Sequence, residues 1–324
     1  MTTERIWSDE ELIALYERVD NAGRWGPDDE LGTLNFITAA KRVRAAALVQ
    51  VGEVLSLAVP IAPRPVPAGP AAVDHRLFYG NDPSNPVHMP PHAGDFLGLD
   101  LHQHGLTHLD CLSHMGSHDG RFYNGRRFED VAQPDGLTHG SIFAQRGGIV
   151  SRGVLLDVAA GLGRDWLEPT HAFSATELEA AERYGKLVVE SGDVVVIRAG
   201  VEAREAVHGP SALGPGPAPD AIEWLHDREV AVYAGDAPEH LTETGARILG
   251  LLPQVEPAEN ATHFPIRLHQ IGIPAMGLIL LDYCRVEELA RRCNELRRHE
   301  FLFAAAPLAL PGGTGSPVNP LAIL

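Results

Sequence analysis

In the second half of the chain, short apolar runs alternate with stretches in which apolar residues recur every three or four positions. Apolar runs of this length are typical of buried strands, and the spaced pattern is typical of helices that bury one face. Their alternation indicates an α/β domain. We therefore predict strands at residues 150–158, 193–198, 229–235 and 301–307, and helices at 178–184, 218–226 and 287–299.

Two Ser-x-x-Glu sequences mark where helices begin. In such a sequence the serine side chain accepts a hydrogen bond from the backbone N–H three residues later. The glutamate side chain in turn accepts one from the backbone N–H of the serine. Ser8 with Glu11 predicts a helix over residues 8–20, and Ser174 with Glu177 leads into the first helix predicted above. The pattern leaves open whether the helix at 8–20 is a lid, a dimer-facing arm or a plain surface helix.

The first half of the chain is irregular and rich in proline, and no change in composition marks a linker between domains. A chain of 34.9 kDa with 44% hydrophobic residues can bury a substantial core. We therefore predict one α/β domain that spans residues 1–324.

Charge and cysteine content exclude several classes of partner and compartment. A formal net charge of −17 argues against nucleic acid and anionic membrane surfaces, because both bind through clustered Lys and Arg. No apolar run approaches the length of a transmembrane helix, and the first residues lack the apolar core of a secretory signal. The cysteines, Cys111, Cys284 and Cys293, are few and odd in number, which indicates a reducing cytoplasm.

Three histidines and an aspartate lie close together in one stretch. His104, His108, Asp110 and His114 fall within eleven residues. Imidazole nitrogens and carboxylates are ligands that zinc, manganese and iron share, so the stretch indicates a metal site. The alternative is a His-rich surface loop.

The spacing of these residues assigns them different roles. Residues two apart on an extended strand project from one face, so His108 and Asp110 can hold the same ion. His104 lies roughly 13 Å from His108 in an extended chain, and a bend at Gly105 would bring it to that ion. His114 lies further along, where a neutral imidazole beside a metal-bound water would move protons.

This stretch, His104-Gly-Leu-Thr107-His108-Leu-Asp110-Cys-Leu-Ser-His114, resembles the signature His-x-Gly-Thr-His-x-Asp-x-Pro-x-His. The signature belongs to the metal-dependent hydrolases called putative cyclases, which include kynurenine formamidases and isatin hydrolases. Three further runs, at 25–35, 122–125 and 312–320, are similar to segments of the longer members and follow the same order. The chain departs from the signature at Leu106 and Leu112, and neither departure replaces a ligand.

The resemblance implies both a fold and a set of residue roles. The fold would be a swivelling β/β/α domain, a small barrel-like sheet flanked by helices, with metal ligands at one end. His104, His108 and Asp110 would coordinate a divalent ion, Zn²⁺ or Mn²⁺, and His114 would act in catalysis.

The family also has a histidine that a polar residue follows thirteen positions later, commonly glutamate in the formamidases. His269 and Asp282 stand at this offset and are predicted to act as a catalytic proton relay, with His263 as an alternative to His269. Aspartate is one methylene shorter than the glutamate that bridges two zinc ions, which favours one ion per chain and leaves two open. His102 and His118 flank the motif and are interpreted as structural or surface histidines.

These residues predict hydrolysis of a non-peptide amide, lactam, lactone or ester of a small cyclic or aromatic molecule by a metal-activated water. The alternative is a non-haem Fe(II) oxygenase, because His108, Asp110 and His269 match its two-His-one-carboxylate site. That alternative leaves His104 and His114 without a role. A small-molecule substrate and a homodimer or higher homo-oligomer are the expected partners.

Overall fold

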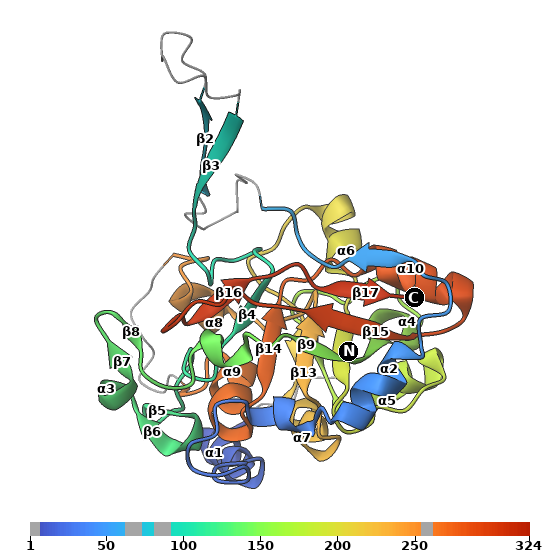
Figure 1. The fold of residues 1–324 in the computed structure, drawn as a ribbon. Helices are drawn as coiled ribbons and strands as arrows, with labels where there is room; N and C mark the ends of the chain where they lie inside the picture. Colours follow the sequence, from blue (N-terminus) through green and yellow to red (C-terminus); the bar gives the residue numbers. More distant parts are fainter. Residues whose placement is uncertain (1–6, 62–72, 81–91, 254–261) are drawn as a thin grey trace, which may run out of the picture.

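The computed structural model describes residues 7–61, 73–80, 92–253 and 262–324. Its central feature is a nine-stranded sheet in the order β1-β17-β15-β9-β11-β13-β14-β4-β16. The strands are β1 (Val54–Ser56), β4 (His108–Asp110), β9 (Ile149–Asp157), β11 (Val194–Arg198), β13 (Val232–Gly235), β14 (Ile279–Asp282), β15 (Glu300–Ala305), β16 (Gly315–Pro317) and β17 (Leu321–Ile323). The sheet curls strongly, as a half-barrel, and helices flank it (Figure 1).

The helices are α1 (Asp9–Arg18), α2 (Ala39–Ala46), α3 (Phe128–Val131), α4 (Val158–Gly161), α5 (Ala175–Gly185), α6 (Val201–His208), α7 (Pro219–Asp227), α8 (Glu243–Ile248), α9 (Arg267–Ile271) and α10 (Glu287–Leu296). Shorter turns of helix lie at Gly32–Phe36, Tyr123–Gly125, Ile142–Gln145 and Gly272–Met276. Four two-stranded ribbons pair β2 (Asp74–Gly80) with β3 (His92–Gly98), β5 (Arg121–Phe122) with β6 (Arg126–Arg127), β7 (Ala132–Gln133) with β8 (Gly136–Leu137), and β10 (Ala172–Phe173) with β12 (Gly216–Pro217). Within the described ranges no helix has the length and apolarity needed to cross a membrane.

Strand direction divides the sheet into a parallel centre and two antiparallel ends. Strands β9, β11, β13 and β14 run parallel to one another, as strands joined by helices usually do, and β15 runs antiparallel beside β9. At one end the short strand β4 runs antiparallel between β14 and β16. The predicted metal motif therefore lies beside the carboxyl end of β14, because Asp282 is paired with His108.

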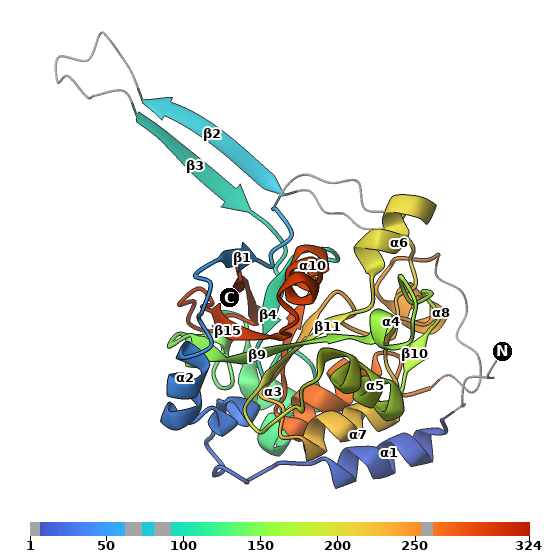
Figure 2. The ribbon, with the colours of Figure 1, turned by 90° about the vertical axis from the view of Figure 1, so that its right-hand side faces the viewer.

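Each central strand contributes to two hydrophobic cores, one on each face of the sheet. Val195 and Ile197 of β11 pack with α1, α5 and α7, whereas Val194 and Val196 pack with α10. Figure 2 shows α1, α5 and α7 on one side of β9 and β11 and α10 on the other. Because both faces are covered, these strands are mostly apolar, as the sequence pattern indicated.

The predicted elements of the second half are confirmed to within a few residues. Both capping boxes form, at Ser8 with Glu11 and at Ser174 with Glu177. Helix α10 ends at Leu296 because the next residue takes a left-handed conformation, with φ of 52°. Helix α1 packs against α7 through buried side chains, so it forms part of the core. The predicted fold class, an α/β domain with a barrel-like sheet flanked by helices, is confirmed, and the sheet forms a half-barrel.

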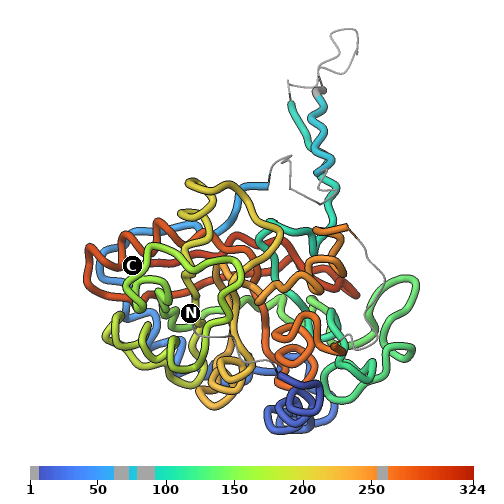
Figure 3. Tube along the Cα trace, turned by 180° about the vertical axis from the view of Figure 1, so that it is seen from behind, coloured from blue at the N-terminus to red at the C-terminus, as the bar shows by residue number. Residues whose placement is uncertain are grey.

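The ribbon of β2 and β3 stands away from the body of the molecule (Figures 1 and 3). We call these residues, 74–80 and 92–98, the β2–β3 arm. Leu77 and Leu97 lie on one face of the arm, and Phe78 and Phe96 lie on the other. All four side chains are about half exposed.

Candidate metal centre

Strand β4 supplies two of the predicted site residues. His108 and Asp110 flank Leu109, which enters the core, so both project from the opposite face of the strand. His108 Nδ1 donates a hydrogen bond to the Leu106 carbonyl oxygen over 2.8 Å. Its other ring nitrogen, Nε2, faces Asp110 and lies 3.5 Å from Oδ1.

The Asp110 carboxylate is the centre of the site, and its side chain is 1% exposed. From Oδ1 the distances are 3.0 Å to His102 Nδ1, 3.5 Å to His108 Nε2 and 4.0 Å to His114 Nε2. From Oδ2 the distance to His269 Nε2 is 3.6 Å. Burial alone would raise the pKa of Asp110, but the surrounding imidazoles, His114 foremost, outweigh it and hold that pKa far below its usual value.

The donor atoms of this cluster fit a divalent cation. Among the described residues neither Asp110 oxygen has a hydrogen-bond partner, and the same holds for His102 Nδ1 and Asp282 Oδ1. Buried polar atoms without partners are costly unless a cation or proton satisfies them. Two groups of three donors, each within 4.8 Å of one another, share Asp110: His102 with His108, and His269 with Asp282. Nitrogen and oxygen donors suit zinc, manganese or iron.

The turn before β4 decides which additional histidine reaches Asp110. Gly105 takes a φ of +81°, so the chain bends where the sequence predicted a bend. The bend brings His102 to Asp110 and leaves the His104 ring against Tyr283, with the ring centroids 4.8 Å apart. His104 belongs to neither group of donor atoms in the described residues, and its role as a ligand stays a prediction.

His102 was interpreted from the sequence as a structural or surface residue, and that interpretation missed its place in the cluster. Its ring stacks on His114 with centroids 3.7 Å apart, and its Nε2 lies 2.9 Å from Thr314 Oγ1. Gly315 of β16 lies directly beneath, where a Cβ would come within 2.6 Å of the ring. The glycine-rich tail therefore leaves space for the His102 ring. These glycines are the one feature of the sequence that pointed to a role for His102.

His114 follows β4 and lines the cavity beside the cluster. Burial lowers the pKa of His114 to about 4, although the charge of Asp110 opposes this shift. The imidazole is therefore neutral at pH 7 and can accept a proton. Its predicted role as a catalytic base stays a prediction.

His269 approaches Asp110 from helix α9. Its Nε2 lies 3.3 Å from Asp282 Oδ2, at the end of β14, and its Nδ1 lies 3.1 Å from Glu239 Oε2. Burial would lower the pKa of His269, but Asp282 and Glu239 outweigh it and raise that pKa well above its usual value. The structure therefore joins the predicted pair, His269 and Asp282, to the carboxylate of Asp110.

At two further residues the structure adds to what the sequence predicted. His263, the alternative to His269, is exposed, and its backbone N–H donates to Asp9 Oδ2 over 2.9 Å. Glu239 was not predicted, since a lone glutamate in a loop carries no local pattern. The signal for it is its place just after β13, because the carboxyl ends of parallel strands gather at ligand sites.

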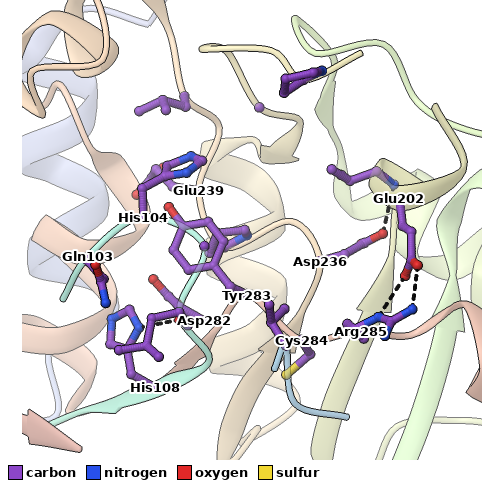
Figure 4. A pocket seen from close by; sticks show the side chains of 18 of the residues that line it. Gln103, His104, His108, Glu202, Asp236, Glu239, Asp282, Tyr283, Cys284 and Arg285 are labelled. Carbon is purple, nitrogen blue, oxygen red and sulfur yellow. Dashed lines mark hydrogen bonds and ion pairs between the residues drawn. The ribbon is translucent and has the colours of Figure 1, made fainter. Parts of the chain in front are cut away.

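The cluster borders a cavity of about 770 Å³. Figure 4 shows His104, His108, Glu239 and Asp282 around Tyr283 on one side of it. Across the cavity Arg285 and Glu202 form an ion pair of 2.6 Å, next to Asp236. The remaining wall is largely apolar and includes Leu106, Met115, Leu167, Val201, Leu213 and Leu241. Such a cavity suits a small molecule with an apolar body.

Fold and site together define a mixed α/β protein with a candidate metal centre where β4 meets β14. The family model described as putative cyclase matches residues 55–240, which is more than half of the chain. The chain therefore belongs to the putative cyclase family, as the motif at residues 104–114 indicated.

Several solved structures are similar to this chain. A crystal structure of a protein described as a novel cyclase shares 28% identity with a TM-score of 0.76, and the match covers 94% of this chain and 100% of that one. Isatin hydrolase A from Labrenzia aggregata shares 19% identity with a TM-score of 0.53, covering 83% and 93%. A second isatin hydrolase shares 18% identity with a TM-score of 0.54, covering 89% and 99%. No curated protein matches the chain.

Proposed function

We propose that this chain is a metal-dependent hydrolase that cleaves an amide, lactam, lactone or ester bond of a small cyclic or aromatic molecule with a metal-activated water. The observation that carries the proposal is Asp110, a buried carboxylate with unpartnered oxygens that four imidazoles surround beside a cavity of about 770 Å³. The two isatin hydrolase structures hold benzyl benzoate and the product analogue thioisatinate, which supports a ring-bearing substrate.

The proposed ligands are His108, Asp110 and a third imidazole from the turn before β4. We propose His104 as this third ligand, because the register of the family motif assigns it the position. His102 is the competing candidate, because its Nδ1 lies 3.0 Å from Asp110 Oδ1. We favour one Zn²⁺ or Mn²⁺ ion per chain. The alternative is two ions per chain, the second of them bound at Asp282. When bound, such an ion lowers the pKa of a coordinated water towards neutrality and polarises a carbonyl group.

The side chains around the cluster would bind the substrate and move protons. His114, neutral at pH 7, would accept a proton at Nε2 from the attacking water and return it to the leaving nitrogen or oxygen. His269, held between Glu239 and Asp282, would act as a second relay from Nε2. Tyr283 and the apolar wall would exclude bulk water and position the ring of the substrate.

The test is a screen of lactams, lactones, aryl esters and N-formyl amides, performed without oxygen or 2-oxo acid and with metal analysis of the same sample. We expect hydrolysis that a chelator abolishes and that added Zn²⁺ or Mn²⁺ restores. Turnover that requires oxygen and Fe(II) would replace the proposal with the oxygenase alternative.

We also propose that the chain forms a homodimer through the β2–β3 arm. An isolated two-stranded ribbon is marginal in water, yet this arm exposes apolar side chains on both faces. Its described charged side chains, Asp74, Arg76 and Asp95, nearly cancel, whereas the whole chain carries −17. The arm is therefore a region through which two copies can approach with little repulsion.

Light scattering tests the homodimer. The wild-type chain should have twice the 34.9 kDa mass of one chain, and the double variant Phe78→Ser/Leu97→Ser should have the single mass. A matched control, Val43→Ser/Val188→Ser, replaces exposed apolar residues on the body and should stay dimeric. A monomeric wild type, or a dimeric arm variant, would refute this interface.

A reducing cytoplasm is the compartment that we propose. Cys111, Cys284 and Cys293 are all buried and free of disulfide bonds. Burial raises the pKa of each thiol, so these side chains act as apolar core residues.

A further inference from the structure

Helix α9 begins without a capping side chain of its own. The residue before it, Ile266, offers no hydrogen bond to the first turn. Glu239, from the loop after β13, supplies this function instead: its Oε1 accepts from Leu268 N over 3.3 Å and its Oε2 from His269 N over 3.2 Å. A residue about thirty positions away in the sequence therefore fixes where α9 starts, and with it the backbone of His269.

The same carboxylate also contacts the His269 ring. Glu239 Oε2 lies 3.1 Å from Nδ1, and Oε1 accepts a further bond from His240 N over 3.1 Å. Each Glu239 oxygen accepts hydrogen bonds from backbone N–H groups, and Oε2 also accepts from the His269 ring, so Nδ1 of His269 carries the hydrogen. The other ring nitrogen, Nε2, is then directed at Asp282 Oδ2 and Asp110 Oδ2, at 3.3 and 3.6 Å.

We infer that Glu239 is a positioning residue of the active site, which holds His269 in the one orientation that presents Nε2 to Asp110 and Asp282. This inference rests on the proposed function for its effect on turnover. Glu239 is buried, and two of its contacts fix the backbone of α9 at its first turn while a third fixes the ring, so neither the helix nor the imidazole is free to turn. A partner of this kind behind a catalytic or metal-bound imidazole typically contributes about 10- to 100-fold to activity or affinity.

Glu177 provides a matched control. It caps α5 by accepting from Ser174 N over 2.7 Å, and it contacts His171 Nε2 at 3.0 Å, so it too joins a helix start to an imidazole. It does not line the cavity of the metal cluster. Glu177→Gln and Glu239→Gln therefore perturb similar contacts and differ in their distance from Asp110.

The experiment compares Glu239→Ala, Glu239→Gln and Glu177→Gln with the wild type in two measurements. Proton NMR follows the low-field resonance of the His269 Nδ1–H, identified by its loss in His269→Gln. We expect this resonance in the wild type and in Glu177→Gln, and its loss in Glu239→Ala. Kinetics should show that both Glu239 variants lose about 10- to 100-fold in kcat with KM changed less than about threefold, while Glu177→Gln keeps its turnover.

A wild-type resonance that survives in both Glu239 variants, or a kcat within about twofold of the wild type in both, would overturn the inference. If Glu239→Ala does not fold, Glu239→Gln alone decides, because its amide can satisfy some of the same backbone donors. A wild-type chain that hydrolyses no substrate would refute the proposed function, and the proton resonance would then still decide whether Glu239 orients His269.

Discussion

The two carboxylate oxygens of Asp110 face groups that reach the site in different ways. Oδ1 faces His102, His108 and His114, all from one short stretch around β4. Oδ2 faces His269 from α9, behind which lie Glu239 from the loop after β13 and Asp282 from the end of β14. The first side depends on the local path of one segment, whereas the second depends on which strands are neighbours in the sheet.

This difference indicates which side is held more firmly. On the distant side Glu239, His269 and Asp282 are tied to buried strands and to a capped helix start. On the local side the third imidazole depends on a turn at Gly105, and His102 and His104 compete for one position. We call the His269 side of Asp110 the relay side and the β4 side the ligand side. We therefore expect substitutions on the relay side to affect proton transfer, and substitutions on the ligand side to affect metal binding or catalysis by His114.

Asp110→Asn should have the largest effect, because it removes the charge that both sides share. We expect no measurable hydrolysis and a loss of metal affinity beyond the roughly 100-fold that an outer partner contributes. Isothermal titration and metal analysis check this, with Asp95→Asn on the β2–β3 arm as the control. Asp110→Asn protein that keeps metal and activity would show that the centre lies elsewhere.

His114→Ala should separate catalysis from metal binding on the local side. Loss of the proposed base should lower kcat by about 10²- to 10⁴-fold while most of the metal stays bound. His108→Ala should lose both, because it removes a ligand. Equal loss of metal in the two variants would assign His114 to the ligands instead.

His104→Ala and His102→Ala test the turn before β4. On the register of the family motif we expect His104→Ala to weaken metal binding by more than about 100-fold, and His102→Ala by less than about tenfold. Titration of both variants with Zn²⁺ measures this. The reverse order would make His102 the third ligand and confirm the arrangement around Gly315.

Asp282→Asn should have the smallest effect on the metal, because we place Asp282 behind His269 on the relay side. Turnover should fall by roughly 10- to 100-fold with a smaller change in affinity, and titration should saturate near one ion per chain. A wild-type stoichiometry of two, with one ion lost in Asp282→Asn, would instead make Asp282 a ligand of a second ion.

The sequence predicted the parallel part of the fold well because apolar runs and capping boxes are local signals. His108, Asp110 and the bend at Gly105 could be predicted for the same reason. His102 could not, since its place depends on Gly315, far away in the chain, having no side chain. Glu239 could not either, because its partners come together only when the loop after β13 meets the first turn of α9. Local sequence patterns identify the ligand side of Asp110, whereas only the folded chain identifies the side of His269 and Glu239.

The most direct test of the account is a crystal structure of the zinc-loaded protein with anomalous scattering recorded at the zinc edge. The account predicts a peak bonded to Asp110 and to Nε2 of His108 at about 2.0–2.2 Å, with Nε2 of His269 turned towards the same carboxylate. No peak at Asp110 in fully loaded crystals, or a zinc ion held by other residues, would contradict it.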